Sequence, residues 1–350
     1  MTALGVGVVG AGPVTQAIHL PTLARLRDEL VVAHVMDVDA TVARSVAARV
    51  GASWSTSVEE LLDDPAVEIV AICTPPAVHA EQVRAAILAG VRGILCEKPF
   101  ATSLADAQAL AVAALESHTP LIVGAMHAFD PAWRAAQDAW GDLAETVHTV
   151  RSSIVLPPNR RYEHWASEIL APVPTGEAPD LRGPESRARR FRDSILGLAI
   201  HDVPLIRMFA PVIERMSDGE VLEPFGYAVS VAGGGRSVEF FGHMHEHARP
   251  AWSVEAWSPH ARLRVDFTPS YVHAGSAVAT LATPAHSVQL GPFETNGYIE
   301  EWKHLARLAR GDSQPAEDVQ SIVDDLEYAM RISAAVPLPA PLTQEKEART

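Results

Sequence analysis

The sequence predicts an α/β fold in which a doubly wound parallel sheet precedes an α+β domain with an open, mostly antiparallel sheet. Three observations support this expectation. Strand-like apolar runs alternate with helix-like segments as far as residue 124, a glycine-rich turn follows the first run, and short β-like runs separated by Gly and Pro dominate Tyr227–Leu290. Alternation of this kind implies right-handed crossovers, which make the first sheet parallel.

Composition limits the class of protein. The chain has 350 residues, enough for two domains, and a formal net charge of −15, which argues against nucleic-acid binding or anionic-membrane binding through a basic surface. Cys73 and Cys96 are too few for a disulfide framework. The first apolar run lacks a basic segment before it, so we interpret it as a strand and not as a signal peptide. No apolar run is long enough to span a membrane, and we expect a cytoplasmic location.

The first turn has the character of a phosphate-binding loop. The apolar run Leu4–Val9 is followed by glycines and then by a helix-like segment, Val14–Leu26. Such a strand–turn–helix holds a dinucleotide pyrophosphate, because glycine lets backbone N–H groups approach phosphate oxygens at a helix N-terminus. Thr15 takes the third position of the G-x-G-x-x-G pattern, so the match is imperfect. We expect the cofactor to contact Gly10, Ala11, Gly12, Pro13 and Val14.

An acidic residue after the second strand favours NAD as the cofactor. The strand-like run Leu30–Met36 ends at Asp37, near the spacing at which a carboxylate hydrogen-bonds the adenosine ribose. The same carboxylate would repel the 2′-phosphate of NADP, so NADP is the less favoured cofactor. A turn residue without contact to a cofactor is the alternative for Asp37.

The other predicted elements of the first domain end in polar or turn residues. Ligands of doubly wound sheets bind at the carboxyl ends of strands, so Thr74-Pro75-Pro76, Glu97-Lys98-Pro99 and Ala125–Phe129 are expected to border them. The predicted strands are Glu68–Cys73, Ile94–Cys96 and Pro120–Val123, and the predicted helices are Thr41–Val50, Ser57–Leu62, Glu81–Ala89 and Leu104–Ser117.

The later part of the chain predicts a second domain. We expect boundaries at 1–124 for a dinucleotide-binding domain, 125–336 for a domain that binds substrate and mediates oligomerisation, and 337–350 for a tail. Pro157–Arg192 has no clear periodicity, whereas Ser194–Phe209 is predicted to be helical. The predicted strands are Glu145–Leu156, Tyr227–Val231, Ser237–Glu246, Ala251–Trp257, Ala261–Phe267 and Ser287–Leu290, and the closing helices are Tyr298–Arg310 and Pro315–Ala334.

Taken together, these motifs resemble those of the Gfo/Idh/MocA oxidoreductase family. The matching residues are Gly10-Ala11-Gly12 with His19-Leu20-Pro21, Thr74-Pro75-Pro76 with His79, Cys96-Glu97-Lys98-Pro99-Phe100, His201-Asp202, and a closing helix from Glu317-Asp318 to Tyr328-Ala329. The resemblance implies a Rossmann domain that binds NAD(P), with His79 and Glu97 among the cofactor-site residues, and an open-faced α/β domain. It also implies oxidation of a secondary alcohol, or reduction of a ketone, on a sugar, cyclitol or related polar molecule. A homodimer or homotetramer through the open sheet is a further expectation.

Two residues are the main candidates for this chemistry. Hydride transfer from a carbinol carbon requires removal of the hydroxyl proton, and the protein supplies position and a proton path. Lys98 follows a buried strand, so we expect its ammonium in the cleft, where it would polarise the reacting oxygen. His201 matches the family's site histidine, and neutral imidazole accepts a proton near pH 7. An exposed strand-end lysine and a buried core histidine are the alternatives.

The chain departs from the family next to the proposed base. The resemblance implies an aspartate one helical turn before His201, where this chain has Gly197. Glycine cannot orient an imidazole as a carboxylate would, although Asp193 is a partial substitute. A weakened base, a different proton acceptor or a redox-silent protein would follow. His127 is the alternative acid–base residue, with an interdomain polar contact as its other interpretation, and Phe129 is expected near the substrate.

Two clusters suggest binding roles outside this core. Arginines are concentrated in Arg182–Arg192, and we hypothesise that Arg189 and Arg190 clamp a carboxylate or phosphate of an anionic substrate. A solvated charged surface is the alternative. Three histidines alternate on a predicted strand but would be too far apart to close around one ion, so no metal site is expected: His243, His245 and His247.

Three functions fit these residues. The first is an NAD(H)-dependent oxidoreductase acting on a small polar alcohol or ketone. The second is an enzyme that retains NAD through a transient oxidation, as in an epimerase or an eliminating glycosidase. The third is a non-catalytic, NAD-binding regulatory protein. Gly197 favours the third, whereas Lys98 and His201 favour the first two.

Overall fold

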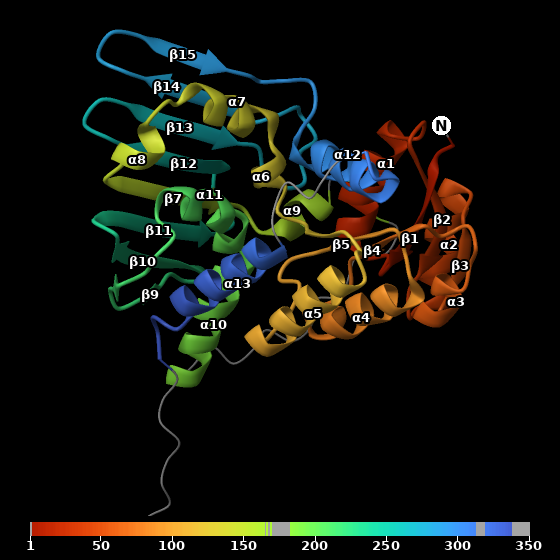
Figure 1. The fold of residues 1–350 in the computed structure, drawn as a ribbon. Coiled ribbons are helices and arrows are strands. Elements are labelled where there is room, and N and C mark those ends of the chain that lie inside the picture. Colours follow the sequence, from red (N-terminus) through yellow and green to blue (C-terminus); the bar gives the residue numbers. More distant parts are fainter. Residues whose placement is uncertain (1, 165, 167–168, 170–182, 313–318, 338–350) are drawn as a thin grey trace, which may run out of the picture.

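Two sheets with their helices lie side by side in the protein (Figure 1). The computed structural model describes residues 2–164, 166, 169, 183–312 and 319–337. Among the helices in these ranges, none has the length and apolar character needed to cross a lipid bilayer.

The first sheet is parallel throughout, in the order β3–β2–β1–β4–β5–β6. The strand order reverses between β1 and β4, which is the point at which doubly wound sheets bind their ligands. The predicted fold class is confirmed, and β3 is a short strand that sequence analysis missed. The strands are β1 (Leu4–Val9), β2 (Leu30–Met36), β3 (Ser53–Ser55), β4 (Ile69–Ile72), β5 (Gly93–Cys96) and β6 (Leu121–Val123).

The helices around this sheet begin and end at residues with clear capping roles. Side chains of Asp39, Ser57 and Ser103 accept hydrogen bonds from the first backbone N–H groups of α2, α3 and α5. Left-handed glycines, Gly51 and Gly90, end α2 and α4. The helices are η1 (Thr15–His19), α1 (Leu20–Arg25), α2 (Ala40–Val50), α3 (Val58–Leu62), η2 (Pro76–Val78), α4 (His79–Ala89) and α5 (Leu104–Glu116).

The second sheet has nine strands in the described ranges, in the order β15–β14–β13–β12–β7–β11–β10–β8, with β9 also paired to β10. Its pairs are antiparallel except that β7 runs parallel to β11. The strands are β7 (Thr149–Leu156), β8 (Arg215–Met216), β9 (Glu220–Val221), β10 (Phe225–Gly233), β11 (Arg236–Met244), β12 (Ala251–Trp257), β13 (Arg262–Phe267), β14 (Val278–Ala282) and β15 (Ser287–Leu290). The predicted mostly antiparallel sheet is confirmed, although β8, β9 and β14 were missed.

The segment before His201 is broken, where sequence analysis predicted one helix over Ser194–Phe209. α10 (Pro184–Gly197) begins within the segment that showed no periodicity, and it is followed by η3 (Ala199–His201) and α11 (Val203–Phe209). Pro204 explains the restart at α11, because proline has no N–H for an intrahelical bond and is tolerated only in a first turn. The break turns the chain so that Gly197 and His201 both line one cavity.

Three short helices lie between the two sheets in sequence: α6 (Met126–Phe129), α7 (Pro131–Ala139) and α8 (Leu143–Thr146). The predicted strand from Glu145 was therefore wrong at its start, because residues 145 and 146 belong to α8 and β7 begins at Thr149. A further short helix, α9 (Asn159–Glu163), follows β7. Asp130 starts α7 by accepting a hydrogen bond from Ala132 N at 2.8 Å.

The last two helices tie the sheets together. On α12 (Gly297–Arg310), Trp302 and Leu305 belong to the same apolar cluster as Val6 and Val8 of β1. The second of the two, α13 (Val319–Ser333), packs against α5, α10 and α11. Residues 315–318 of the predicted closing helix lie outside the described residues.

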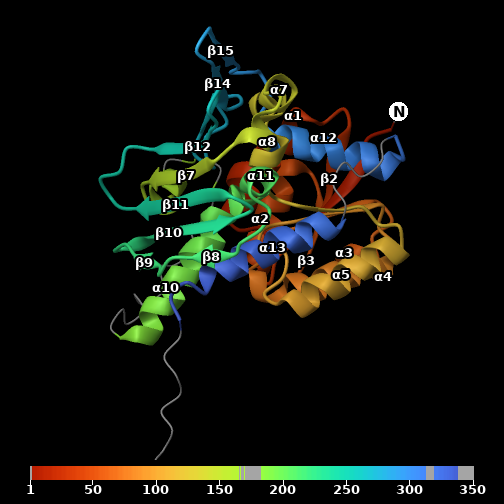
Figure 2. The same cartoon turned by 60° about the vertical axis from the view of Figure 1, so that its left-hand side comes forward.

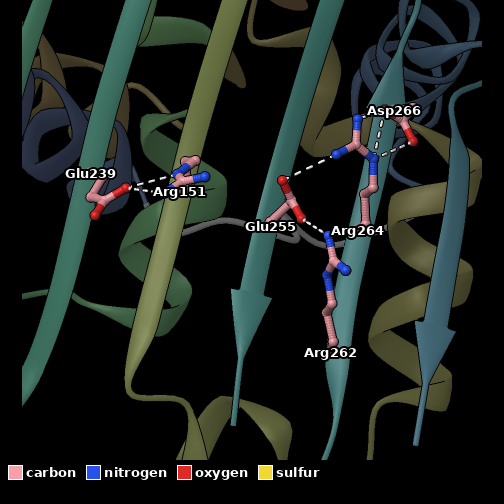
Figure 3. Close-up of polar contacts among 6 residues, drawn as sticks. All are labelled: Arg151, Glu239, Glu255, Arg262, Arg264 and Asp266. Carbon is pink, nitrogen blue, oxygen red and sulfur yellow. Dashed lines mark hydrogen bonds and ion pairs between the residues drawn. The ribbon is translucent and has the colours of Figure 1, made fainter.

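Among the described residues, the helices lie on one face of the second sheet and leave the other face open (Figure 2). The open face holds a row of ion pairs across four neighbouring strands, β11, β7, β12 and β13 (Figure 3). Glu255 accepts hydrogen bonds from Arg262 and from Arg264, the latter at 3.1 Å. The same row contains the pair Arg151–Glu239, 2.6 Å apart. We call the residues Arg151, Glu239, Glu255, Arg262, Arg264 and Asp266 the charge row.

Candidate active site

A cavity of about 180 Å³ lies where the carboxyl ends of the first sheet meet the second. It brings together residues that are far apart in the sequence and come from both sheets. From the first-sheet side it is lined by Val14, Ile18, Cys73, Thr74, Glu97, Lys98, Gly124 and Met126, and from the other side by Leu156, Asn159, Gly197, Leu198, His201, Trp252, Ser270, Tyr271 and Tyr298.

The glycine turn at the edge of this cavity is built to leave space above its backbone. Gly10 has φ +91°, and a Cβ there would lie 2.8 Å from the carbonyl oxygen of Cys73, so a side chain is excluded by strain and by contact. A Cβ on Gly12 would meet nothing within 4 Å. Thr15 Oγ1 donates to Gly10 O at 2.5 Å, which gives the departure from the glycine pattern a structural role. The open space beside Gly12 fits a phosphate group at a helix start.

Asp37 is oriented toward the same turn. Its Oδ2 accepts a hydrogen bond from Ala11 N at 2.8 Å, and its Oδ1 accepts one from Asp39 N at 3.0 Å. These two bonds fix the carboxylate beside the turn, where the ribose of a bound dinucleotide would lie.

Lys98 is held inside the cavity. The Lys98–Pro99 peptide is cis, and Nζ donates a hydrogen bond to Gly197 O at 3.0 Å. Burial lowers the pKa of the ammonium, and the neighbouring Glu97 carboxylate offsets part of that shift. The contact joins the end of β5 to the end of α10, so the amine bridges the two halves of the cavity.

Glu97 lies behind Lys98 in a buried hydrogen-bond chain. Trp302 Nε1 donates to His19 Nδ1 at 3.2 Å, and His19 Nε2 lies 2.9 Å from Glu97 Oε1. Because an indole N–H only donates, the proton of His19 is on Nε2 and points to Glu97. Burial alone would raise the pKa of Glu97, but the hydrogen bond from His19 and the charge of Lys98 lower it below its ordinary value. Gly124 leaves room for this carboxylate, because a Cβ there would crowd Glu97 at 3.2 Å.

His79 connects the loops that follow β4 and β5. It is buried, with Nδ1 2.9 Å from Pro99 O and Nε2 2.6 Å from Thr74 O. Thr74 lines the cavity, whereas Pro75 and Pro76 are exposed. His79 therefore supports the loop that carries Lys98 and is not itself part of the cavity wall.

His201 lines the cavity but has no orienting partner. Its Nδ1 is buried and makes no hydrogen bond with any described residue, which agrees with the glycine at position 197. Burial lowers the pKa of His201 well below its ordinary value, and the charges of Lys98 and His127 lower it further. The imidazole is therefore neutral around pH 7.

The carboxylate next to His201 orients a different histidine. Asp202 is fully buried, and its Oδ1 lies 2.8 Å from His127 Nδ1. Its other contacts are a hydrogen bond from Ser152 Oγ at 2.7 Å and one from Trp252 Nε1 at 3.0 Å to each oxygen. His127 also stacks on Phe267, with ring centroids 3.8 Å apart. His127 lies behind the cavity wall, its ring centroid 5.9 Å from that of His201.

Several predicted substrate residues lie outside the cavity. Phe129 packs against His304 and Arg134 and does not line the cavity. Arg190 pairs with Glu223, and Arg189 is exposed on α10, roughly 10 Å of helix before its cavity end. The structure thus does not bring Phe129, Arg189 or Arg190 to the cleft, because α10 reaches it only with its last turn. Arg182 lies outside the described residues.

The histidine triplet does not form the regular strand face that sequence analysis expected. β11 ends at Met244, so His245 and His247 are not strand residues, and His243 Nε2 lies 2.7 Å from Glu223 O. In the parts of the chain that the structure describes, no group of three or more His, Cys, Asp or Glu side chains is arranged to hold a metal ion.

Several cavity residues were missed by sequence analysis, because they come from strands and loops without a motif. Trp252 lies on β12, Asn159 starts α9, and Tyr298 lies in the first turn of α12. The only sequence signal was the concentration of aromatic residues in the second sheet region, which does not distinguish a cavity wall from a core.

Comparison with known proteins finds relatives of the first part of the chain. Residues 4–125 match the family model described as "Oxidoreductase family, NAD-binding Rossmann fold". An inositol 2-dehydrogenase of Saccharopolyspora erythraea is 34% identical over 134 residues, which cover 38% of this chain and 39% of that protein. A 1,5-anhydro-D-fructose reductase of Ensifer adhaerens is 40% identical over 109 residues, which cover 30% of this chain and 32% of that protein. The matched stretches thus span only about a third to two fifths of these relatives.

Solved structures extend the likeness to the whole fold. UDP-N-acetylglucosamine 3-dehydrogenase GnnA of Acidithiobacillus ferrooxidans superposes with a TM-score of 0.74 at 20% identity, over 96% of this chain and 98% of that one. The 3-ketoreductase KijD10 of Actinomadura kijaniata, solved with NADP and TDP-benzene, gives a TM-score of 0.72 at 19% identity, over 95% and 98%. The chain therefore shares the two-sheet fold of these structures. Its residues 4–125 resemble the NAD-binding domain of the Gfo/Idh/MocA oxidoreductases.

Proposed function

We propose that this protein transfers a hydride between NAD(H) and a secondary alcohol or ketone of a sugar, a cyclitol or a related polar molecule. The observation that carries the proposal is the cavity itself, in which Lys98 and His201 lie beside the start of η1. A bound nicotinamide would supply the hydride acceptor or donor, and the protein would hold the reacting oxygen.

The residues present fit a dinucleotide. The open space beside Gly12 accommodates phosphate, and Asp37 is held where it would accept hydrogen bonds from ribose hydroxyls. Because a 2′-phosphate would meet the Asp37 carboxylate, we propose NAD in preference to NADP.

The cavity wall favours a polar, hydroxyl-rich substrate. Asn159, Ser270 and Tyr271 offer donors and acceptors, and Trp252 offers an apolar face. The relatives named for inositol, anhydrofructose and a nucleotide sugar act on molecules of this chemistry. Lys98 would donate a hydrogen bond to the reacting oxygen, and His201 would form a hydrogen bond with the same oxygen from the opposite wall.

We also propose that the protein forms a homodimer or homotetramer through the open face of the second sheet. In the described residues helices cover only the other face, and the charge row alternates in sign from strand to strand. An alternating row can pair with a second copy related by two-fold symmetry.

The test is a screen of inositols, 1,5-anhydro-D-fructose and UDP-N-acetylglucosamine with NAD(H) and NADP(H), monitored by nicotinamide absorbance. With the best substrate, Lys98→Ala should lower kcat by about 10²- to 10⁴-fold, because a group that touches the reacting oxygen is lost. Lys303→Ala is the matched control, since this lysine pairs with Glu300 on α12 and lies outside the cavity. Unchanged turnover in Lys98→Ala would refute the proposed chemistry. Bound NAD that survives gel filtration without net turnover would instead support a retained-cofactor reaction.

A further inference from the structure

His127 and His201 differ in their hydrogen-bond partners. The two roles to be assigned are hydrogen bonding to the reacting oxygen and acceptance of its proton. A base that keeps a proton near Lys98 needs an anionic partner to stabilise the resulting imidazolium. His201 has no such partner among the described residues, and an N–H on its buried Nδ1 would have no acceptor. His127, in contrast, has the Asp202 carboxylate 2.8 Å from its Nδ1.

The tautomer of His127 follows from this contact. An ionised carboxylate only accepts hydrogen bonds, so the neutral ring carries its proton on Nδ1 and keeps the lone pair of Nε2 for a second proton. Ser152 and Trp252 donate to the same carboxylate, which holds it in place and satisfies its remaining lone pairs. This is the geometry in which a buried aspartate prepares a histidine to accept a proton.

We infer that His127, oriented by Asp202, holds the proton released from the substrate, and that His201 acts as a hydrogen-bonding partner of the reacting oxygen. The inference rests on the proposed function and deepens it. In the oxidation direction a bound NAD⁺ would accept the hydride that leaves as the substrate C–H bond breaks. The substrate O–H bond would break as the C=O bond of the ketone forms, and the proton would pass through a water molecule to His127 Nε2, leaving an imidazolium paired with Asp202.

The placement of His127 makes it a positioning and proton-storing residue and not part of the cavity wall. The residue is only 3% exposed, and its ring centroid lies 4.6 Å from that of Trp252 and 5.9 Å from that of His201, which both line the cavity. His127 thus forms the layer directly behind the cavity wall, and the proposed connection to its Nε2 is one water molecule.

Other ionisable groups around His127 bear on its protonation. Asp202 and Asp130 are the nearby acids, and Asp130 is buried at the start of α7, where it accepts backbone hydrogen bonds. His201 and, beyond it, Lys98 are the bases on the cavity side, and Tyr227 is near Asp202. The acids thus lie on the side of His127, whereas the charged group nearest to His201 on the cavity side is Lys98.

Proton uptake by each histidine can be measured without a substrate. Long-range ¹H–¹⁵N NMR of the full chain, with signals assigned by His127→Gln, His201→Gln and the exposed control His260→Gln, reports the tautomer and charge of each ring. We expect His127 to be the Nδ1–H tautomer and to gain a proton at a higher pH than His201. Asp202→Asn should abolish that order. An Nε2–H tautomer of His127, or prior protonation of His201, would overturn the inference.

Kinetics provide the second arm. With a substrate from the screen, the acid limb of kcat/KM for oxidation should disappear in His127→Gln, whereas His201→Gln should lower the rate at all pH values and keep the limb. Glutamine at 127 retains an N–H for Asp202, and a melting temperature close to wild type would show that the fold survives. A limb that disappears with His201→Gln, or that persists in both variants, would contradict the assignment. Failure of every compound in the screen would count against the proposed function, and the NMR result would still decide the roles of the histidines.

Discussion

At the scale of single residues, the cavity is surrounded by buried ionisable groups, and most of them have partners. Glu97 is paired with His19, and Asp202 with His127. Glu301 on α12 differs, because it is fully buried and neither oxygen accepts a hydrogen bond from a described residue. Burial raises the pKa of Glu301 well above its ordinary value, with the charge of Glu97 adding to the shift and that of His19 opposing it. The group is therefore a neutral acid at low pH and costs free energy when it ionises.

The orphan carboxyl gives a stability prediction with a defined sign. Because the folded-state pKa of Glu301 is raised, its proton contributes to the free energy of unfolding. This contribution is fully present below the unfolded-state pKa of about 4.3 and is lost as pH rises through the folded-state pKa. Glu301→Met removes this loss and should stabilise the protein by about 1–3 kcal/mol near pH 7. Urea unfolding at several pH values measures it. Glu300→Gln, which only breaks a half-exposed pair with Lys303, should change stability by less than about 0.5 kcal/mol. Equal pH profiles for wild type and Glu301→Met would contradict the prediction.

Cofactor choice is also decided by one residue. Asp37→Asn removes the negative charge beside the glycine turn and keeps nearly the same shape, so the preference for NADH over NADPH should fall by about tenfold or more, which corresponds to about 1.4 kcal/mol. Binding of both cofactors, followed by nicotinamide fluorescence, measures the ratio. Asp39→Asn is the control, since this residue caps α2 and its side chain accepts from Thr41 N at 2.8 Å. A wild type that prefers NADPH would refute the role of Asp37.

At the scale of elements, the turn between β1 and η1 contains two glycines with different roles. One is needed for the fold, and the other adjoins the proposed binding space. Gly10 is required by its positive φ and its contact with Cys73, whereas Gly12 adjoins open space. Two side-chain hydrogen bonds hold the turn in place. Thr15 Oγ1 donates to Gly10 O, and Gln16 Nε2 donates to Ala11 O at 2.7 Å. The element therefore holds its shape through side chains on one side and leaves its backbone free on the other.

The two glycines form a matched pair for mutation. Gly10→Ala should destabilise the fold by about 1–3 kcal/mol, because alanine is strained at this φ and its Cβ meets backbone. Gly12→Ala should leave the melting temperature unchanged but weaken NADH binding by about tenfold or more, because its Cβ occupies the space proposed for phosphate. Thermal unfolding and isothermal titration calorimetry distinguish the two effects. If Gly12→Ala bound NADH as wild type does, the phosphate site would lie elsewhere.

At the scale of the whole molecule, contacts across the two sheets build the site. α12 returns from the second sheet to pack on the first, and it places Trp302 on His19 and Tyr298 at the cavity. Arg92 Nε donates to Ala309 O at 3.1 Å, and Arg310 donates to Glu29 O at 3.0 Å. The helix α12 thus supports the chain of hydrogen bonds behind Lys98. The division at residues 124 and 125 stays a prediction.

The proposed assembly is tested on the open face. Arg264→Glu opposes Glu255 and reverses one position of the charge row, so it should shift the protein toward monomer in sedimentation velocity, by about tenfold or more in dissociation constant. Arg84→Glu, an exposed substitution on α4, is the control with the same charge change. Equal sedimentation of the two variants would place the interface on another face.

Much of the first half could be predicted, because its signals are local. Apolar runs, caps such as Asp39 and Ser57, and terminal glycines such as Gly51 depend on neighbours in sequence. The break between α10 and α11 could not be predicted in the same way, since the apolar residues around His201 are equally compatible with one continuous helix. Phe129 was expected at the substrate because it follows a strand end, but its ring packs against His304 and does not line the cavity.

The sequence by itself determined the alternation that makes a parallel sheet, the glycine turn, and the presence of Lys98 and His201, because each depends on residue type and local spacing. Only the tertiary structure decided which groups meet. In the folded protein the Asp202 carboxylate contacts His127 Nδ1, although Asp202 is the chain neighbour of His201. His201 Nδ1 has no hydrogen-bond partner among the described residues. The physical reason is that a buried carboxylate bonds the donors that packing brings within reach, and β7, α6 and β12 bring those donors to Asp202 from distant parts of the chain.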